Sequence, residues 1–422
     1  MAKTDIRVIS NGVEGVYVPC EKFKKSVLSV SFFMPLDKIT ATGNSLLSGL
    51  LTRGTKEYDN YTKINARLNE LYGASISSYT GSIGDMQQVV FKVSCINDKY
   101  CGEEVLSKAV ALLTEMIFNP LMQDGLFLKK NFDSEKRLLI ESIENDLNDK
   151  RKYALQKLSK VLYKDELCEN SSKGDYEVAK TLSESDAVEA WKNLLNNAFV
   201  RIVLCSAEKN ESIFDLFKSE FDKLNRSVVK ENITKKHIRK ENVKVVDEFM
   251  DVTQGKLCLG FSVDSDHSDK SHATLRVLTD IIGGGTYSNL FTNVREKQSL
   301  CYYCTARPNN LKGTIVVDSG ILNENREDAQ MSILKEIADV KYGGIDEERL
   351  NISKKSLCDS LVTSVEDSIF EIDTWYAVRL FAEDDSIEGY KKAIEAVSLQ
   401  DVLSLAETIK LDSIYFLGKE EA

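Results

Sequence analysis

Apolar positions along the chain predict two series of segments that follow the same order: a strand, a helix, a hairpin, two long helices and a closing strand. The first series covers residues 28–32, 46–51, 75–79 with 88–93, 105–117, 127–147 and 199–205. The second covers residues 257–261, 273–282, 300–306 with 313–319, 329–337, 346–370 and 413–417. The repeated order predicts an α+β fold that is duplicated, each half being an antiparallel sheet with helices packed on it.

One stretch between the two series is polar and lacks apolar periodicity. It runs from Arg226 to Asn242 and is rich in lysine, arginine and asparagine, which is typical of a linker. The sequence therefore predicts an N-terminal domain over residues 1–226, a linker over residues 227–242 and a C-terminal domain over residues 243–422.

The helix predicted around residues 43–55 carries an unusual polar face. Its leucines form one apolar side, whereas Ser45, Ser48, Gly49 and Thr52 recur at helical spacing on another. Glycine and serine are poorer helix formers than alanine, so propensity does not explain this line of small side chains. The pattern indicates a helix face that needs room, or a position that has lost larger side chains.

Composition narrows the classes of protein. The chain has 422 residues, 42% hydrophobic and 29% charged, which is typical of a soluble globular protein. A net charge of −11 argues against a nucleic-acid-binding surface. The sequence shows neither an N-terminal signal peptide nor an apolar run long enough for a membrane span, so we expect a cytoplasmic protein.

The cysteines and histidines of this chain show few spacings that are typical of metal sites. The nine cysteines are an odd number and fit buried thiols in a reducing compartment. Cys301 and Cys304 form a close pair on a predicted strand, where packing is favoured over metal binding or redox use. His267 and His272 lie near Asp264 and Asp266 in a polar segment; a metal site there remains an alternative.

The densest motif follows the predicted helix at 273–282. Its glycines indicate a helix C-cap and a sharp turn rather than a phosphate loop. The motif resembles the second half of the insulinase-type, or pitrilysin-type, metallopeptidases, in the processing-peptidase branch. The matching residues are Gly284, Gly285, Ser288, Leu290, Phe291, Val294, Arg295, Glu296, Lys297, Leu300 and Tyr302.

The resemblance implies that the first half has lost a zinc site. Catalytic members carry His-x-x-Glu-His on a helix, followed by a basic residue and Gly-Thr. In this chain Arg53, Gly54 and Thr55 match the basic residue and Gly-Thr, and they anchor the alignment. The three positions become Ser45, Ser48 and Gly49, which can neither hold zinc nor activate its water. The third ligand position becomes Ser142, or Glu141 with a one-residue slip. Glu135 and Glu141 are interpreted as surface charge, and no metal or other cofactor is expected.

The second half keeps two residues that match substrate-binding residues of the family. Arg295 and Tyr302 match an arginine and a tyrosine that hydrogen-bond the substrate backbone near the scissile bond in that family. The structural alternative is an arginine that caps helix carbonyls and a tyrosine that packs in a strand.

The resemblance therefore implies a non-catalytic member shaped as half of a clamshell. It would bind a peptide or unfolded polypeptide and complete the chamber of a zinc-bearing partner subunit of the same family, or pair with itself. Similar bacterial members are linked by name to modification of elongation factor P. Two alternatives remain: a degenerate peptidase fold that serves as an assembly scaffold, and an independent metalloenzyme.

Overall fold

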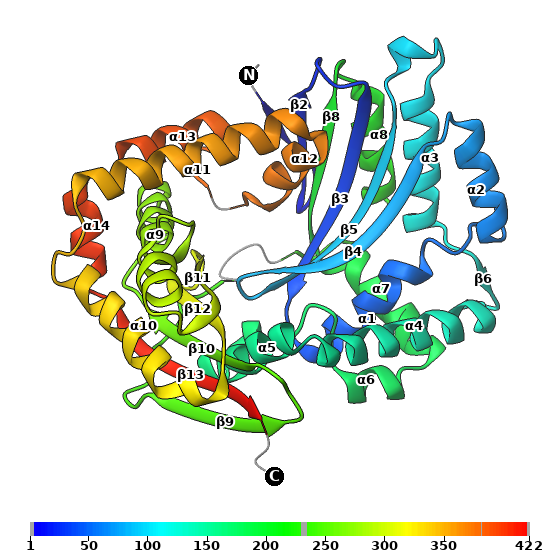
Figure 1. The fold of residues 1–422 in the computed structure, drawn as a ribbon. Helices are drawn as coiled ribbons and strands as arrows, with labels where there is room; N and C mark the ends of the chain where they lie inside the picture. Colours follow the sequence, from blue (N-terminus) through cyan, green and yellow to red (C-terminus); the bar gives the residue numbers. More distant parts are fainter. Residues whose placement is uncertain (1–3, 229–233, 381, 420–422) are drawn as a thin grey trace. The chain divides into compact units, whose positions relative to one another are not determined.

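The computed structural model describes residues 4–228, 234–380 and 382–419. The chain divides by its own contacts into two compact units (Figure 1). The first contains residues 1–144, 170–233 and 364–380, and the second contains residues 145–169, 234–363 and 381–422. Each unit thus includes a segment from the other end of the chain. The two domains expected from the sequence, residues 1–226 and 243–422, divide the chain by its repeated pattern and not by contacts. Their boundaries stay a prediction.

The first unit is built on a six-stranded sheet with the order β1-β2-β8-β3-β5-β4. Its strands pair antiparallel except β2 with β8, which run parallel. Their bounds are β1 Asp5–Ser10, β2 Val13–Pro19, β3 Lys25–Pro35, β4 Ser75–Ile83, β5 Met86–Ile96 and β8 Phe199–Ser206. A short hairpin, β6 Met122–Gln123 and β7 Leu126–Phe127, lies apart from the sheet.

Helices cover one face of this sheet and enclose its core. They are α1 Lys38–Leu50, α2 Tyr61–Glu70, α3 Val105–Phe118, α4 Lys129–Asn148, α6 Tyr176–Thr181, α7 Glu184–Asn197 and α8 Glu211–Phe221. Leu28, Val30 and Phe32 alternate along β3 and point into this core, where they are fully buried. Burial of these alternating side chains fixes the register of the central strands.

The opposite face of the sheet carries buried polar side chains among apolar ones. Helix α12, Ile369–Val378, packs on this face against β3 and β8 (Figure 1). Asp373 of this helix is fully buried, and its carboxylate contacts the Lys92 ammonium of β5 at 2.6 Å. The hydroxyl of Ser29 on β3 donates to the same carboxylate at 2.5 Å. Because buried charges are costly unless they are paired, this ion pair specifies where α12 lies.

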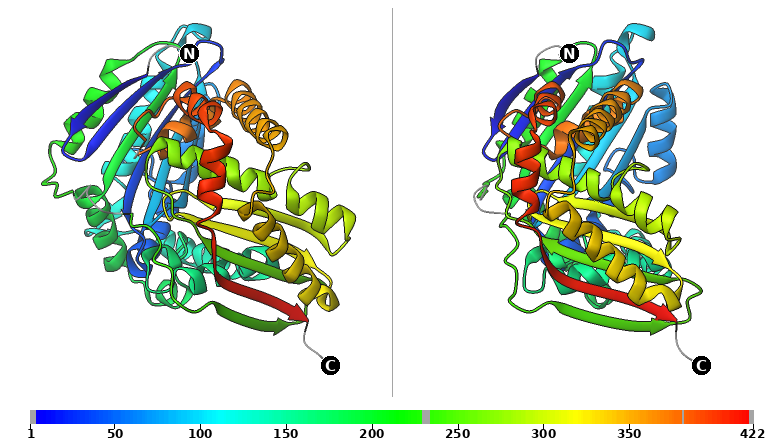
Figure 2. Two further views of the ribbon diagram at one scale, coloured as in Figure 1. Left: turned by 90° about the vertical axis from the view of Figure 1, so that its left-hand side faces the viewer. Right: turned by 60° about the vertical axis from the view of Figure 1, so that its left-hand side comes forward.

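The second unit repeats the arrangement on a five-stranded sheet with the order β11-β12-β10-β13-β9. The strands are β9 Lys244–Met250, β10 Gly255–Ser262, β11 Cys301–Asn309, β12 Thr314–Ile321 and β13 Lys410–Lys419. Figure 2 shows β9 at one edge, parallel to β13. The α+β fold expected from the sequence is confirmed.

Helices enclose the core of the second unit on one side of its sheet, and α5 packs on β10 and β13 from the other side. The helices of the main core are α9 Asp269–Gly283, α10 Arg326–Lys341, α11 Glu347–Asp367, α13 Ile387–Ala396 and α14 Leu399–Ala406. Helix α5, Lys150–Leu162, comes from the N-terminal half of the sequence. Tyr153, Ala154 and Leu158 bury its apolar side against Cys258 and Tyr415.

The described part of the expected linker, residues 227–228 and 234–242, forms neither helix nor strand, and residues 229–233 lie outside the described residues. Its His237 is buried in the second unit. The imidazole Nδ1 lies 2.5 Å from Glu166, and Nε2 lies 3.1 Å from Asp412. The fully buried ammonium of Lys312 lies 2.6 Å from the other oxygen of Glu166. This cluster attaches the linker firmly to the second unit.

Candidate functional site

The small side chains of α1 are held in a dense set of hydrogen bonds. Asp37 caps the helix by accepting from the backbone N–H groups of residues 39 and 40. About two turns along the helix, the Ser45 hydroxyl donates to the carbonyl of Ser172 at 2.9 Å and accepts from Gln87 Nε2 at 3.3 Å. The hydroxyl of Ser48 donates to the carbonyl of Ser45 at 2.8 Å. The polar face of α1 is therefore filled by neighbouring protein atoms at Ser45.

Glu135 of α4 occupies the space beside Gly49. A Cβ added to Gly49 would collide with the carboxylate of Glu135. Glu135 is 8% exposed, and its carboxylate forms an ion pair with the guanidinium of Arg53. The interpretation of Glu135 as surface charge is therefore wrong, because the helix that carries it turns this side chain inward against α1. Glu141, by contrast, is exposed and pairs with Arg137 at 2.6 Å.

These residues do not fit a zinc ion. Ser45, Ser48 and Gly49 bring no imidazole, and Ser142 brings a hydroxyl where a carboxylate is required. The nearby carboxylate of Glu135 is already neutralised by Arg53. In addition, the ammonium of Lys173 donates to the carbonyl of Ser142 at 3.3 Å, which places a positive charge next to the third ligand position. A dication would meet repulsion there rather than ligands.

The contact between Gly49 and Glu135 predicts that Gly49→Ala destabilises the native chain but stabilises a chain that lacks the Glu135 carboxylate. In the native chain, Gly49→Ala is expected to lower the free energy of unfolding by about 1–2 kcal/mol, because the new methyl group displaces the carboxylate from Arg53. In a Glu135→Ala background the same change is expected to raise it by about 0.5–1 kcal/mol, since alanine is the better helix former. Urea unfolding of the four proteins measures both steps. A loss of equal size in both backgrounds would contradict the contact.

The arginine motif is built on a tightly packed corner of the second unit. Helix α9 ends at Gly283, where a Cβ would approach the Ala306 nitrogen of β11 to 2.6 Å, so glycine permits the close approach. A π-helix, η3, follows over Leu290–Lys297. Such helices are rare and occur frequently at functional sites.

Partly buried polar contacts hold the π-helix on α10. Asn293 donates to the buried carboxylate of Glu336 at 2.7 Å. Just beyond the helix, Gln298 donates to the hydroxyl of Ser332 at 2.8 Å. These two contacts lie on either side of Arg295 in the sequence and fix the backbone that carries it.

Arg295 points its charge toward solvent. Its guanidinium lies over the ring of Phe291 at 4.5 Å, and Nε lies 3.7 Å from Glu296. The side chain is 38% exposed. These contacts hold the guanidinium over an aromatic ring at the surface, where it is accessible to solvent.

Tyr302 lies on a bulge in the edge strand β11. Cys301 pairs with Ile321 and Tyr303 pairs with Gly320, so Tyr302 is the extra residue. Its side chain is 57% exposed. Ser299, between the π-helix and the strand, has a φ of 54°, which turns the chain sharply into β11. The arrangement presents the phenol at the surface instead of packing it in the sheet.

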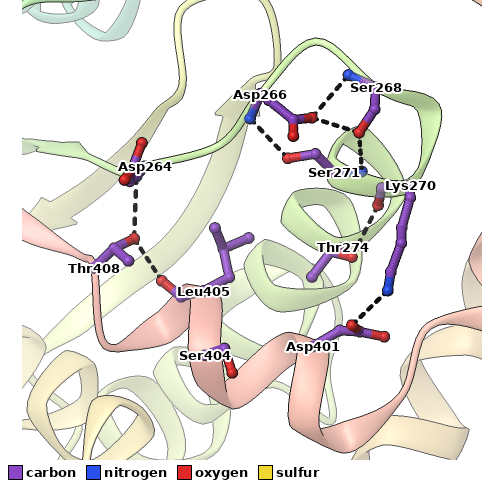
Figure 3. A pocket seen from close by; sticks show the side chains of 10 residues that line it. All are labelled: Asp264, Asp266, Ser268, Lys270, Ser271, Thr274, Asp401, Ser404, Leu405 and Thr408. Carbon is purple, nitrogen blue, oxygen red and sulfur yellow. Dashed lines mark hydrogen bonds and ion pairs between the residues drawn. The ribbon is translucent and has the colours of Figure 1, made fainter.

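His267 and His272 meet at the start of α9, with ring centroids 6.2 Å apart and nearly perpendicular planes. A pocket of about 290 Å³ nearby is lined by Asp264, Asp266 and Lys270 among others (Figure 3). Lys270 pairs with Asp401 of α14 at 2.7 Å. Within the described ranges, neither histidine belongs to a group of three potential ligand atoms that lie within 4.8 Å of one another. This geometry gives the independent metalloenzyme no support.

Comparison with known proteins agrees with the motif and the replaced ligands. Residues 181–357 match the family described as "Peptidase M16 inactive domain". Together with the fold, this match confirms the resemblance to pitrilysin-type peptidases, and residues 181–357 resemble a peptidase-like domain of the inactive M16 type.

Individual relatives extend the match to the whole chain. A Bacillus subtilis protein described as "Probable inactive metalloprotease YmfF" is 28% identical over 416 residues, which cover 97% of this chain and 96% of that protein. A crystal structure of a conserved protein from Enterococcus faecalis V583 superposes with a TM-score of 0.90 at 27% identity over 99% of both chains. A Pseudomonas fluorescens structure, described as a peptidase M16 inactive domain, shares the fold with a TM-score of 0.80 at 17% identity, over 100% of this chain and 98% of that one.

Within the part of the chain that the structure describes, none of the helices combines the length and the apolar character that crossing a bilayer requires.

Proposed function

We propose that this protein binds a peptide through Arg295 and Tyr302 and completes the chamber of a zinc-bearing partner subunit of the same family. The observation that carries the proposal is a contrast between the two motifs. At the positions that match the zinc ligands of catalytic members, the Ser45 hydroxyl is already hydrogen-bonded to the carbonyl of Ser172, and the carboxylate of Glu135 fills the space beside Gly49. At the other motif, an arginine and a tyrosine are both exposed on a firmly anchored backbone.

The chemistry of the pair suits a peptide backbone. A guanidinium and a phenol both donate hydrogen bonds, and a charged donor to a carbonyl oxygen gives a stronger bond than a neutral one. Tyr302 lies on β11, which is an edge of its sheet, and β4 is an edge of the sheet in the first unit. Edge strands offer main-chain groups to which an extended peptide can add.

The setting that we propose is the cytoplasm. None of the cysteines in the described ranges forms a disulfide, as a reducing compartment would require. The partner would supply the zinc, and this chain would supply carbonyl contacts without cleaving peptide alone.

The test is co-expression with a catalytic family member, followed by zinc analysis and a peptide-cleavage assay of the isolated complex. In that complex, Arg295→Ala is expected to lower kcat/KM by about 10–100-fold, since loss of a charged hydrogen bond is worth about 1.5–3 kcal/mol. Tyr302→Phe removes only a hydroxyl, so a decrease of about 3–10-fold is expected.

Arg307→Ala is the matched control, because Arg307 is also exposed on β11 but lies outside the motif. It should leave turnover unchanged. If Arg295→Ala and Arg307→Ala both leave turnover of an assembled complex unchanged, the protein is an assembly scaffold. Stoichiometric zinc and chelator-sensitive cleavage by the isolated chain would contradict the proposal outright.

A further inference from the structure

The pair Cys301 and Cys304 is arranged differently from two cysteines in a regular strand. Side chains alternate between the faces of a strand, so residues three apart should point to opposite sides. The bulge at Tyr302 shifts this alternation by one residue. Both thiols therefore face the same core, where Cys301 is 8% exposed and Cys304 is 2% exposed.

The two thiols also differ in reactivity. A hydrogen bond from the Cys304 thiol, together with the positive charge of Arg295, lowers the pKa of Cys301. The same hydrogen bond and burial raise the pKa of Cys304. A thiolate is the attacking form of cysteine, so Cys301 is the more nucleophilic member and the one closer to solvent.

We propose that Cys301 and Cys304 form a reversible disulfide whose closure moves Tyr302 and thereby regulates the peptide site. The disulfide itself stands on the geometry of the bulge. Its effect on peptide binding rests on the proposed function.

The oxidant would be a low-molecular-weight disulfide such as oxidised glutathione. The Cys301 thiolate attacks one sulfur of that disulfide, forms a mixed disulfide and releases one glutathione thiolate. Cys304 then loses its proton and attacks the sulfur of Cys301, which releases the second glutathione. Two protein thiols are oxidised to one disulfide, and one glutathione disulfide is reduced to two thiols.

Closure must change the backbone at Tyr302. Three residues of regular strand span about 10 Å, whereas the Cα atoms of a disulfide lie about 4.4–6.8 Å apart. The bulge at Tyr302 already departs from regular strand geometry. In the proposed closure the chain between the cysteines contracts further, and Tyr302 and Tyr303 are the residues that lie between them. A bond closed by such a contraction is easily reduced, which suits a switch rather than a structural crosslink.

The experiment titrates the isolated full-length chain with mixtures of reduced and oxidised glutathione. Peptide mapping is expected to find Cys301 and Cys304 in one disulfide, with a mass decrease of about 2 Da that dithiothreitol reverses. Cys95 and Cys258 serve as internal controls, because both are buried and burial raises the pKa of each thiol. They should stay reduced in the same sample.

Movement of Tyr302 is read by a Tyr302→Trp variant. The parent chain has two tryptophans, so the difference in emission between variant and parent reports position 302. Oxidation is expected to shift the wavelength of the fluorescence that comes from the tryptophan at position 302. Adding Cys304→Ser should abolish this shift. A shift that survives Cys304→Ser would show that another group is responsible.

Cys20 and Cys205 are a second pair of buried thiols joined by a hydrogen bond. Two results would overturn the inference: Cys301 and Cys304 remaining reduced, whether or not Cys20, Cys205 or other thiols oxidise, or a mapped 301–304 disulfide with unchanged emission from position 302. Neither readout needs a peptide or a partner subunit. Failure of the peptide-binding proposal would therefore leave the disulfide measurement intact, and failure of the switch would leave the Arg295 experiment intact.

Discussion

Replacing Asp373 by alanine is expected to lower the free energy of unfolding by about 3–5 kcal/mol, the range found when one partner of a buried ion pair is removed. The side chain of Lys92 is 8% exposed in the native chain, so loss of the carboxylate would leave its charge buried and uncompensated between β5 and α12. Ser29 would also lose its acceptor. The cost arises from the remaining charge more than from the lost attraction.

Urea unfolding of Asp373→Ala tests this reasoning when it is measured beside the double variant Lys92→Met/Asp373→Leu. The double variant removes both charges and keeps apolar volume, so it should recover most of the loss. Asp367→Ala is the matched control, because that carboxylate is exposed near the end of α11 and should change stability by less than about 0.5 kcal/mol. A double variant as unstable as Asp373→Ala would indicate that packing, not charge, holds α12.

The second large effect is a pH dependence that comes from His237. The carboxylates of Glu166 and Asp412 oppose the effect of burial and raise the pKa of His237 to about 9, against an ordinary value of 6.5. A raised pKa stabilises the folded protein fully below about pH 6.5, and the contribution is lost as the pH rises through about 9. The difference of 2.5 between these two pKa values corresponds to about 3 kcal/mol.

Thermal unfolding of the native chain and of His237→Gln between pH 6 and pH 10 measures this contribution. The two stability curves are expected to lie far apart at pH 6 and to converge toward pH 10. His267→Gln is the control, because desolvation and nearby lysines lower the pKa of His267, so that this side chain is neutral in both the folded and the unfolded chain well above pH 6.5. Its curve should therefore parallel that of the native chain between about pH 8 and pH 10, where the curve of His237→Gln converges with it. Parallel curves for His237→Gln and the native chain would mean that His237 is not the titrating group.

The elements near the arginine motif could be predicted from the sequence because local signals agree there. The apolar period of residues 273–282, the glycines after it and the alternating residues 313–319 correspond to α9, its end and β12. The same signals place Arg295 on a helix and Tyr302 on a strand, and the position of that strand at the edge of its sheet comes from the structure. Their exposure follows from the π-helix and the bulge, for which the sequence offers no comparable signal.

The features that escaped prediction depend on contacts between distant residues. Periodicity shows which side of α5 or α12 is apolar but not which sheet that side covers. Likewise, Glu135 follows a helical pattern that fits an exposed position, and only the glycine at position 49 hints at a side chain from elsewhere. The edge strands β1 and β9 were missed because exposed polar residues interrupt their apolar pattern.

Helix α12 belongs to the first unit but is encoded near the C-terminal end of the chain. Its place in the sequence therefore determines when the first unit can finish folding on the ribosome. Its other helices are complete once α8 has been made, at Phe221, but α12 ends only at Val378. At elongation rates of about 5–20 residues per second, the intervening roughly 160 residues take about 8–30 s to synthesise. During that time the ammonium of Lys92 lies on an uncovered sheet face and is hydrated by water. A nascent chain arrested before residue 369 should therefore differ from the finished protein in protease sensitivity along β3 and β5.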